Sequence, residues 1–197
     1  EFPLNPLPEF KDSGAPVRFL MVSRMLIDKG VCEFIDAARI VLGRGRNATF
    51  LLVGPLDETN PGSVSKKVLD SAVRENVIEN MPFQEDMLSL LIACDCFVLP
   101  SYREGLPRSV LEAAAVGRPV ITTDTAGCRR AVNHEESGLI CRPRDVESLV
   151  DALEKMLEKT FRDRRQMGIA GRRRVEHEFS VVRVSQDYQE EIRNLVA

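Results

Sequence analysis

The stretch Ser101-Tyr-Arg-Glu-Gly-Leu-Pro-Arg-Ser-Val-Leu-Glu-Ala-Ala-Ala115 decides the fold at the centre of the chain. It follows the apolar run Cys96–Pro100, which is typical of a buried strand. A glycine then marks a turn. Pro107 predicts the first residue of a helix, because a proline there has a helical φ and needs no N–H partner. A strand, a turn and a helix in direct succession favour an α/β fold.

The start of this helix is predicted to bind an anion. The amides of its first residues have no carbonyl partner within the helix, and they lie at the positive end of the helix dipole. Glu104 lies on the turn before the helix, and Glu112 lies about one and a half turns inside it. Because carboxylates accept hydrogen bonds from sugar hydroxyls, a phosphate site between two acids indicates a nucleotide sugar. The alternative is two exposed acids near a helix start, where acids are common.

A second segment, Ser23–Gly30, carries two cations after another apolar run. Arg24 and Lys29 are five residues apart; an arginine can bind a phosphate through two N–H groups, and a lysine acts as a point charge. Together they can hold both phosphates of a nucleoside diphosphate and stabilise the charge on a leaving group. Taken alone, this segment favours an ordinary loop between a strand and a helix, and only its combination with Glu104 favours a phosphate site.

The order of the apolar runs predicts the fold class. Strand-like runs alternate with helical periodicity, which is typical of a Rossmann-like, doubly wound parallel sheet of about six strands with helices on both faces. Ligands of such sheets bind outside the carboxyl ends of the strands, where Arg24, Gly54 and Glu104 follow the first, second and fourth predicted strands. The predicted strands are 18–22, 49–53, 77–78, 96–99, 119–122 and 138–141, and predicted helices include 65–75, 86–93, 162–178 and 180–196.

The composition excludes several functional classes. The chain has 197 residues, of which 44% are apolar and 29% charged, and its net charge of −3 predicts no general affinity for nucleic acid. No apolar run approaches the ~20 residues needed to cross a bilayer, and no signal-peptide pattern opens the chain. The five cysteines lack the spacing of a zinc site. Cys94 and Cys96 are predicted to be reduced core thiols of a cytosolic protein.

Three segments are predicted along the chain. Residues 1–16 hold four of the eleven prolines and show no periodicity, which is typical of an interdomain linker. Residues 17–178 are predicted to form a nucleotide-sugar-binding, Rossmann-like domain. Residues 179–197 are predicted to form a C-terminal helix.

Several of these segments resemble a known family of enzymes. Glu104–Pro107 followed by Glu112 resembles the E-x7-E motif of retaining glycosyltransferases of the GT-B fold, the large family-four type. Ser23–Gly30 is similar to the G-R-x4-K-G segment of that family, with a serine in place of the usual first glycine. Residues 101–108 and Thr122–Arg129 resemble bacterial enzymes that extend capsular and undecaprenyl-linked oligosaccharides. The resemblance covers most of the chain.

The resemblance implies a role for each of these residues. Glu104 would accept hydrogen bonds from the donor sugar beside the reacting carbon, and Glu112 would hold the ribose. Glu104, Arg24 and Lys29 are the implied catalytic residues. The other implied donor-binding residues are Gly54, Met81, Pro82, Gly105, Leu106, Pro107 and Arg108, with the base near Met81 and Pro82. Besides the serine at position 23, two more positions depart from the family pattern: Pro82 stands where the family usually has glycine, and Arg130 where it usually has an acid.

The implied function is that of the donor-binding half of a retaining glycosyltransferase. It would move a sugar from a UDP-hexose or UDP-N-acetylhexosamine to a growing, lipid-linked surface polysaccharide, without a metal or other cofactor. The implied partners are the nucleotide-sugar donor, an N-terminal acceptor-binding domain onto which the C-terminal helix would cross, and an undecaprenyl-linked glycan, but no nucleic acid. The expected location is cytoplasmic, at the inner face of the membrane through the missing domain.

Two other functions stay open at this point. The chain could be a nucleotide-sugar-binding subunit or sensor without turnover, or a UDP-sugar epimerase. The isolated domain is expected to be inactive in sugar transfer, because catalysis in GT-B enzymes takes place between two domains.

Overall fold

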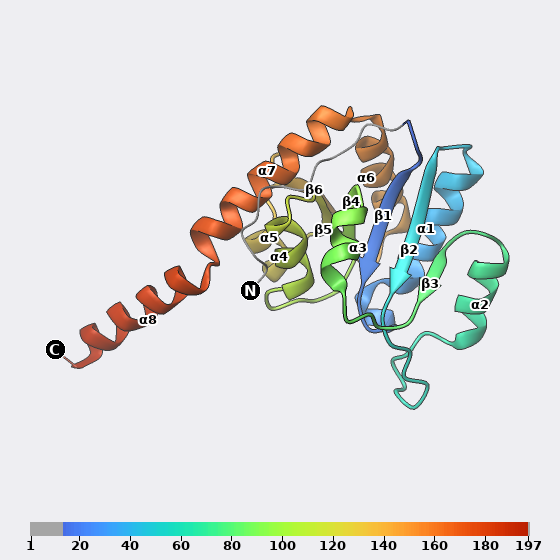
Figure 1. The fold of residues 1–197 in the computed structure, drawn as a ribbon. Helices are drawn as coiled ribbons and strands as arrows, with labels where there is room; N and C mark the ends of the chain where they lie inside the picture. The colour runs from blue at the N-terminus through green and yellow to red at the C-terminus, as the bar shows by residue number, and fades with distance from the viewer. Residues whose placement is uncertain (1–13, 197) are drawn as a thin grey trace.

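The computed structural model describes residues 14–196, apart from the side chains at 187, 191 and 196, and shows a six-stranded sheet between layers of helices (Figure 1). The strands lie in the order β3-β2-β1-β4-β5-β6, and each neighbouring pair is parallel. This confirms the predicted Rossmann-like, doubly wound sheet. The strands are β1 Val17–Val22, β2 Ala48–Val53, β3 Glu79–Met81, β4 Cys96–Leu99, β5 Val120–Thr123 and β6 Gly138–Cys141.

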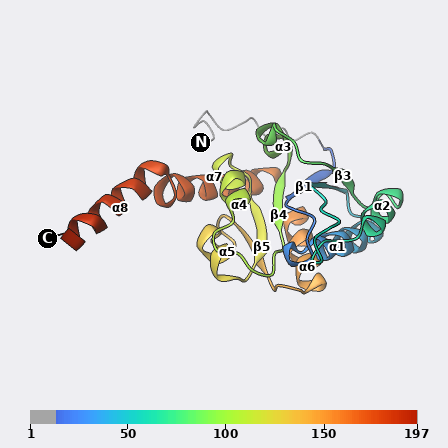
Figure 2. The same cartoon turned by 90° about the horizontal axis from the view of Figure 1, so that it is seen from below.

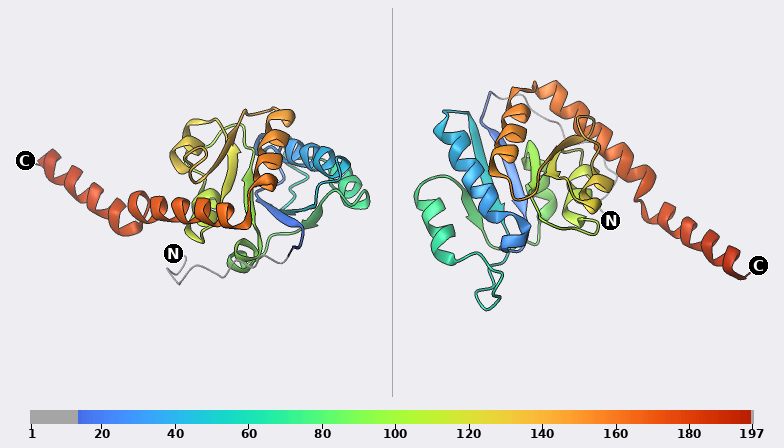
Figure 3. Two further views of the ribbon diagram at one scale, coloured as in Figure 1. Left: turned by 90° about the horizontal axis from the view of Figure 1, so that it is seen from above. Right: turned by 180° about the vertical axis from the view of Figure 1, so that it is seen from behind.

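Helices cover both faces of the sheet. α1 and α6 pack against each other on one face, and α4 and α7 pack against each other on the other (Figures 2 and 3). α7 also approaches the turn after α4 closely, because a Cβ built on Gly168 would lie only 1.8 Å from the carbonyl oxygen of Gly117. The helices are η1 Ile27–Lys29, α1 Val31–Gly43, α2 Lys66–Arg74, α3 Met87–Ala93, α4 Arg108–Ala115, α5 Ala126–Ala131, α6 Val146–Glu158, α7 Phe161–Glu178 and α8 Val181–Val196.

The core forms around the central strand β1. Phe19, Leu20 and Met21 have no exposed surface, as expected of a strand with parallel neighbours on both sides and helices on both faces. The ring of Phe19 stacks on that of Phe50 in β2, with the ring centroids 5.1 Å apart. Cys94 and Cys96 are buried free thiols beside this core. The packed centre holds the carboxyl ends of the strands at one edge of the sheet.

Two predicted element boundaries are wrong. The predicted strand at Val77 and Ile78 lies too early, because both amides donate to the carbonyl oxygen of Ala72 at the end of α2. The two side chains are only 6% and 4% exposed, so their apolar character reflects packing under α2, and β3 follows them. The helix predicted to begin at Pro107 begins one residue later, because this proline has an extended ψ of 110° and serves as the N-cap.

The last helix, α8, extends away from the sheet and the layers packed on it (Figure 1). Three of its apolar side chains, Val181, Tyr188 and Leu195, are 59%, 68% and 79% exposed. They are seven residues apart, so they lie along one side of the helix. None of the helices within residues 14–196 is long and apolar enough to cross a membrane.

Candidate functional site

The loops that follow β1, β2 and β4 lie against one another at the carboxyl edge of the sheet. A Cβ built on Gly54, after β2, would lie 1.8 Å from the carbonyl oxygen of Ser23, after β1. A Cβ built on Gly30 would lie 2.1 Å from the carbonyl oxygen of Pro100, after β4, and Gly30 has a φ of 76°. Both positions therefore require glycine, and the two glycines allow the three loops to meet.

Lys29 and Glu104 form an ion pair where these loops meet. Lys29 Nζ lies 2.7 Å from Glu104 Oε1, and the two side chains are 20% and 14% exposed. An ion pair with so little exposed surface is screened less by salt than a surface pair, and removing either partner leaves a poorly solvated charge. The structure thus brings together two of the three side chains predicted to be catalytic, although 75 residues separate them in the chain.

The turn before α4 is held in place by its neighbours. Ser101 is fully buried, and its hydroxyl donates a hydrogen bond to the carbonyl oxygen of Asp28 at 3.1 Å. The hydroxyl of Thr123, in β5, donates to the carbonyl oxygen of Ser101. At the start of α5, a Cβ built on Gly127 would lie 2.2 Å from the carbonyl oxygen of Gly105. These contacts from three elements fix the turn that carries the Glu104 side chain.

The amino end of α4 borders open space. Val110 N and Leu111 N both donate to the carbonyl oxygen of Pro107 at 3.2 Å, so the amides of Arg108 and Ser109 come before the first helical hydrogen bonds. A Cβ built on Gly105 would meet nothing within 4 Å. The helix start can therefore accept an anion from the side of this glycine.

Glu112 lies one turn into α4 with its side chain 30% exposed. Arg108 Nη2 lies 3.6 Å from Glu112 Oε1, and the Arg108 side chain is 90% exposed. Partial burial raises the pKa of Glu112, and the charge of Arg108 opposes this shift. A carboxylate that is partly desolvated and has one distant, solvated partner keeps most of its acceptor capacity for a ligand.

Arg24, the third predicted catalytic residue, lies in the loop after β1. Its side chain is exposed. Its charge is the last of the causes that lower the pKa of Asp57, after the hydrogen bonds from Thr59. Arg24 thus lies near the loop that follows β2.

The residues predicted to bind the base lie at the carboxyl end of β3, which is the outermost strand on one side of the sheet. Gly54 N donates to the carbonyl oxygen of Met81 at 3.1 Å, which joins the loop after β2 to the end of β3. Met81 is half-buried and Pro82 is exposed, whereas Leu106, beside α4, is 36% exposed. In the sheet, β2 and β1 lie between β3 and β4, so the base-binding residues and the helix start are separated by two strands.

The sequence assigned no role to Tyr102, Glu33 or Arg144, which the structure brings together next to the ion pair. The Tyr102 hydroxyl donates to Glu33 Oε1 in α1, and Arg144 Cζ, in the loop after β6, lies 4.6 Å from the centroid of the tyrosine ring. An acid in the first turn of a helix and an arginine in a loop are common surface features, so neither stands out in the sequence. The one available signal is a tyrosine three residues after the end of the buried strand that precedes Glu104.

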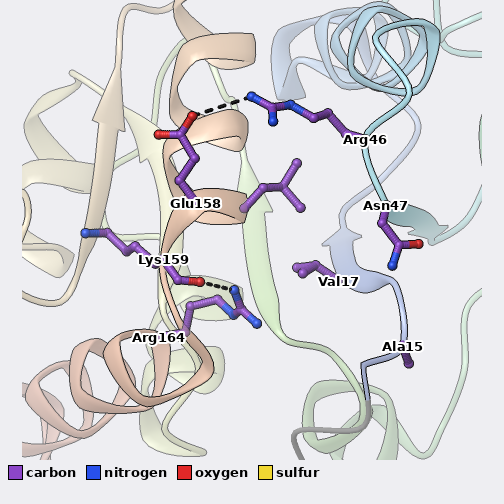
Figure 4. A pocket seen from close by; sticks show the side chains of 8 residues that line it. Ala15, Val17, Arg46, Asn47, Glu158, Lys159 and Arg164 are labelled. Carbon is purple, nitrogen blue, oxygen red and sulfur yellow. Dashed lines mark hydrogen bonds and ion pairs between the residues drawn. The ribbon is translucent and has the colours of Figure 1, made fainter.

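A cavity of about 370 Å³ lies at the opposite edge of the sheet (Figure 4). It is lined by residues at the amino ends of β1 and β2 and around the turn between α6 and α7. The lining residues are Ala15, Val17, Arg46, Asn47, Leu157, Glu158, Lys159 and Arg164. Arg46 Nη2 lies 3.5 Å from Glu158 Oε1, and Arg164 Nη1 donates to the carbonyl oxygen of Lys159 at 2.6 Å. The cavity includes none of the residues that the sequence predicts to bind the donor.

The fold is similar to that of solved structures twice as long. The crystal structure of Anabaena HepE in complex with UDP matches with a TM-score of 0.80 at 24% identity, and the match covers 91% of this chain and 49% of that one. This likeness supports the fold alone.

Sequence comparison identifies the family. The most similar relatives include N,N'-diacetylbacillosaminyl-diphospho-undecaprenol alpha-1,3-N-acetylgalactosaminyltransferase of Campylobacter jejuni, 37% identical over 71% of this chain. They also include the capsular polysaccharide biosynthesis glycosyltransferase CapM of Staphylococcus aureus, 30% identical over 81% of this chain. The matches span 35% and 41% of these relatives, so the chain covers less than half of their length. The model of the family "Glycosyl transferases group 1" matches residues 9–174, and the chain belongs to that family.

Proposed function

We propose that the chain is the donor-binding half of a retaining glycosyltransferase that uses a nucleoside diphosphate sugar. The observation that carries this proposal is the ion pair of Lys29 and Glu104, 2.7 Å apart, on the turn that leads into the open amino end of α4. A cation and free helix amides suit a pyrophosphate, and a carboxylate beside them suits the hydroxyls of the attached sugar.

The proposed binding step exchanges the partners of the ion pair. The pyrophosphate takes Lys29, whose ammonium group has three N–H donors, and Glu104 turns its oxygens to the sugar hydroxyls. The anion also meets the helix amides near Gly105, where the space is open. Glu112 accepts the ribose hydroxyls, and Arg24 closes on the diphosphate from the loop after β1. The base lies beside Met81 and Pro82.

In the proposed reaction, the protein stabilises the charge of the departing diphosphate. Lys29, Arg24 and the helix amides face the oxygens on which negative charge grows as the glycosidic bond breaks. The acceptor hydroxyl attacks the sugar from the same face, and the leaving phosphate takes its proton, so the anomeric configuration is retained. The two acids hold hydroxyls and do not form a hydrolase acid and base pair. Because these cations supply the charge, no metal ion is needed.

The donor and acceptor are proposed from the relatives. UDP is bound in the structure of Anabaena HepE, and the Campylobacter jejuni relative is named for transfer of N-acetylgalactosamine to an undecaprenol-linked acceptor. We therefore propose a UDP-hexose or UDP-N-acetylhexosamine as donor and a lipid-linked surface glycan as acceptor. Residues 17–178 would form the donor domain, 1–16 the linker and 179–197 a helix that crosses to an acceptor domain. The apolar side of α8 at Val181 and Tyr188 favours such a contact.

A calorimetric titration tests the donor site directly. UDP is expected to bind the chain with a Kd below about 1 mM, and uridine at least about tenfold more weakly, because uridine lacks the charge that Lys29 and α4 recognise. The affinity for UDP is expected to be the same with EDTA as with Mg²⁺. Absence of UDP binding at millimolar concentration, while the circular dichroism spectrum stays that of a folded α/β protein, would contradict the proposal. Incubation with UDP-sugar alone, followed by product analysis, separates an epimerase from a transferase.

A further inference from the structure

We propose that Tyr102 is a positioning residue that sets where Glu104 stands against the donor sugar. It acts through two side chains from other parts of the fold, Glu33 in α1 and Arg144 after β6, and we call these three residues the Tyr102 clasp. The inference rests on the proposed function, because it assigns a task to residues that support the donor site. The clasp itself makes no contact with donor in the proposal.

The clasp joins three elements around one tyrosine ring. The Tyr102 hydroxyl donates to Glu33 Oε1, and the two residues are 69 positions apart in the chain. Arg144 Cζ lies 4.6 Å from the ring centroid, which is within the range of a cation–π contact. Arg144 has a φ of 57°, an uncommon conformation for a residue other than glycine. The loop after β6 is thus shaped to bring the guanidinium over the ring.

The hydroxyl of Tyr102 is important to Glu33. The second carboxylate oxygen, Oε2, is buried and has no hydrogen-bond partner in the described part of the chain. A carboxylate with one buried, unpaired oxygen depends strongly on the hydrogen bond to the other. Burial and the hydrogen bond to Glu33 both raise the pKa of Tyr102, so the hydroxyl stays protonated and remains a donor at neutral pH.

Two of the three chain segments that form the clasp also carry the ion pair. Tyr102 N donates to the carbonyl oxygen of Asp28 at 2.8 Å, one residue before Lys29. Two residues after Tyr102, Glu104 meets Lys29. The hydrogen bond to Glu33 attaches the turn to α1 at a second point, in addition to the Asp28 contact, and so restricts how the turn can move. Its loss is expected to displace Glu104 more than the helix start of α4.

The test compares sugar recognition with nucleotide recognition. The ratio of the Kd for UDP to the Kd for a UDP-sugar measures what the sugar adds to binding, and in the proposal Glu104 contacts the ligand only through its sugar. We choose the tightest-binding of UDP-glucose, UDP-N-acetylglucosamine and UDP-N-acetylgalactosamine as the probe. Tyr102→Phe keeps the ring under Arg144 and removes the hydroxyl. This variant is expected to weaken UDP-sugar binding about tenfold and UDP binding less than about twofold, as the loss of one hydrogen bond to a charged group would do.

Matched variants separate positioning from general stability. The other tyrosine of the chain, Tyr188, is 68% exposed on α8, and Tyr188→Phe is expected to change neither affinity. Glu33→Gln keeps an oxygen that can accept from Tyr102 and is expected to retain most of the sugar contribution. Glu33→Leu has no acceptor and is expected to behave like Tyr102→Phe. If Tyr102→Phe does not fold, the two Glu33 variants decide by the same ratio.

The outcomes are distinct. A native chain that binds no UDP overturns the proposed function, and this inference with it. A native chain that binds UDP and a UDP-sugar, with the ratio unchanged in Tyr102→Phe, overturns the inference and leaves the proposed function standing. An equal loss for both ligands shows a merely structural tyrosine and also overturns it. Binding of UDP without binding of any of the three UDP-sugars leaves Glu104 with no sugar to recognise and counts against the inference.

Discussion

The two edges of the sheet hold similar charged residues and use them differently. At the amino edge, Arg46 pairs with acids of α6 such as Glu158, and Arg164 donates to a carbonyl oxygen at the end of α6. At the carboxyl edge, Lys29 pairs with Glu104 beside the open start of α4. Arg46 and Arg164 thus have partners that belong to the fold, and an anion would have to compete with them. A paired cation therefore indicates a ligand site only where it can leave its partner and bind the ligand instead.

The largest difference between the edges is expected when a cation is removed. Lys29→Met should lower the affinity for UDP about 100-fold, because a charge-assisted contact worth about 2–3 kcal/mol is lost. Arg46→Met, which removes a cation at the amino edge, should change this affinity by less than about twofold. Calorimetric titration of both variants measures the contrast. Equal losses would show that general charge, and not the geometry at the carboxyl edge, attracts the nucleotide.

Gly105 and Gly127 differ in the space that surrounds them. A Cβ at Gly105 enters open space, whereas a Cβ at Gly127 would lie 2.2 Å from a carbonyl oxygen. Gly105→Ala should therefore keep the free energy of unfolding within about 0.5 kcal/mol and weaken UDP binding about tenfold, because a methyl group stands where the phosphate approaches. Gly127→Ala should lower the free energy of unfolding by about 1–3 kcal/mol.

Urea denaturation measures the stability of the two glycine variants, and calorimetry measures their affinity for UDP. If Gly105→Ala binds UDP as tightly as the native chain, the phosphate does not approach α4 from this side.

The parallel sheet and the segments of the site could be predicted from the sequence, because both depend on local patterns. Buried parallel strands are continuous apolar runs, and Lys29 and Glu104 each follow such a run. The run at Val77 and Ile78 misled the prediction, since apolar residues that pack under a helix look the same as a short strand.

The contacts around Tyr102 could not be predicted, because they depend on side chains from distant segments. Glu33 lies 69 residues before Tyr102, and Arg144 lies in the loop after β6. Local periodicity states which face of a helix is buried, but it does not state which polar groups meet across loops.

A smaller, pH-dependent effect is expected at Glu112. Burial raises its pKa in the folded chain above the ordinary value of 4.5, so the folded state holds this proton to higher pH than the unfolded state. The ionisation of Glu112 therefore lowers the free energy of unfolding as the pH rises from 4.5 through the raised pKa. Only the ionised form has both oxygens free to accept ribose hydroxyls, so UDP affinity should fall by about two- to threefold as the pH is lowered from 7.5 through the raised pKa.

The variant Glu112→Gln provides the control for this pH series, because the phosphate of UDP also titrates near pH 6. The ratio of the two affinities removes the contribution of the ligand. It should favour the native chain at pH 7.5 and shrink toward pH 5. A ratio that does not vary with pH would assign the pH dependence to UDP alone.

The smallest effect on UDP binding is expected when Arg164 is replaced. This variant tests whether the cations at the amino edge serve only the fold. The guanidinium of Arg164 donates to the carbonyl oxygens of Lys159 and Met156 at the end of α6, in the wall of the cavity of Figure 4. Arg164→Met should lower the free energy of unfolding by about 1 kcal/mol, because water can reach only part of the carbonyl groups that it leaves. UDP affinity should not change. A loss of UDP affinity at unchanged stability would mean that the two edges are coupled, and that the amino-edge cations serve the ligand as well as the fold.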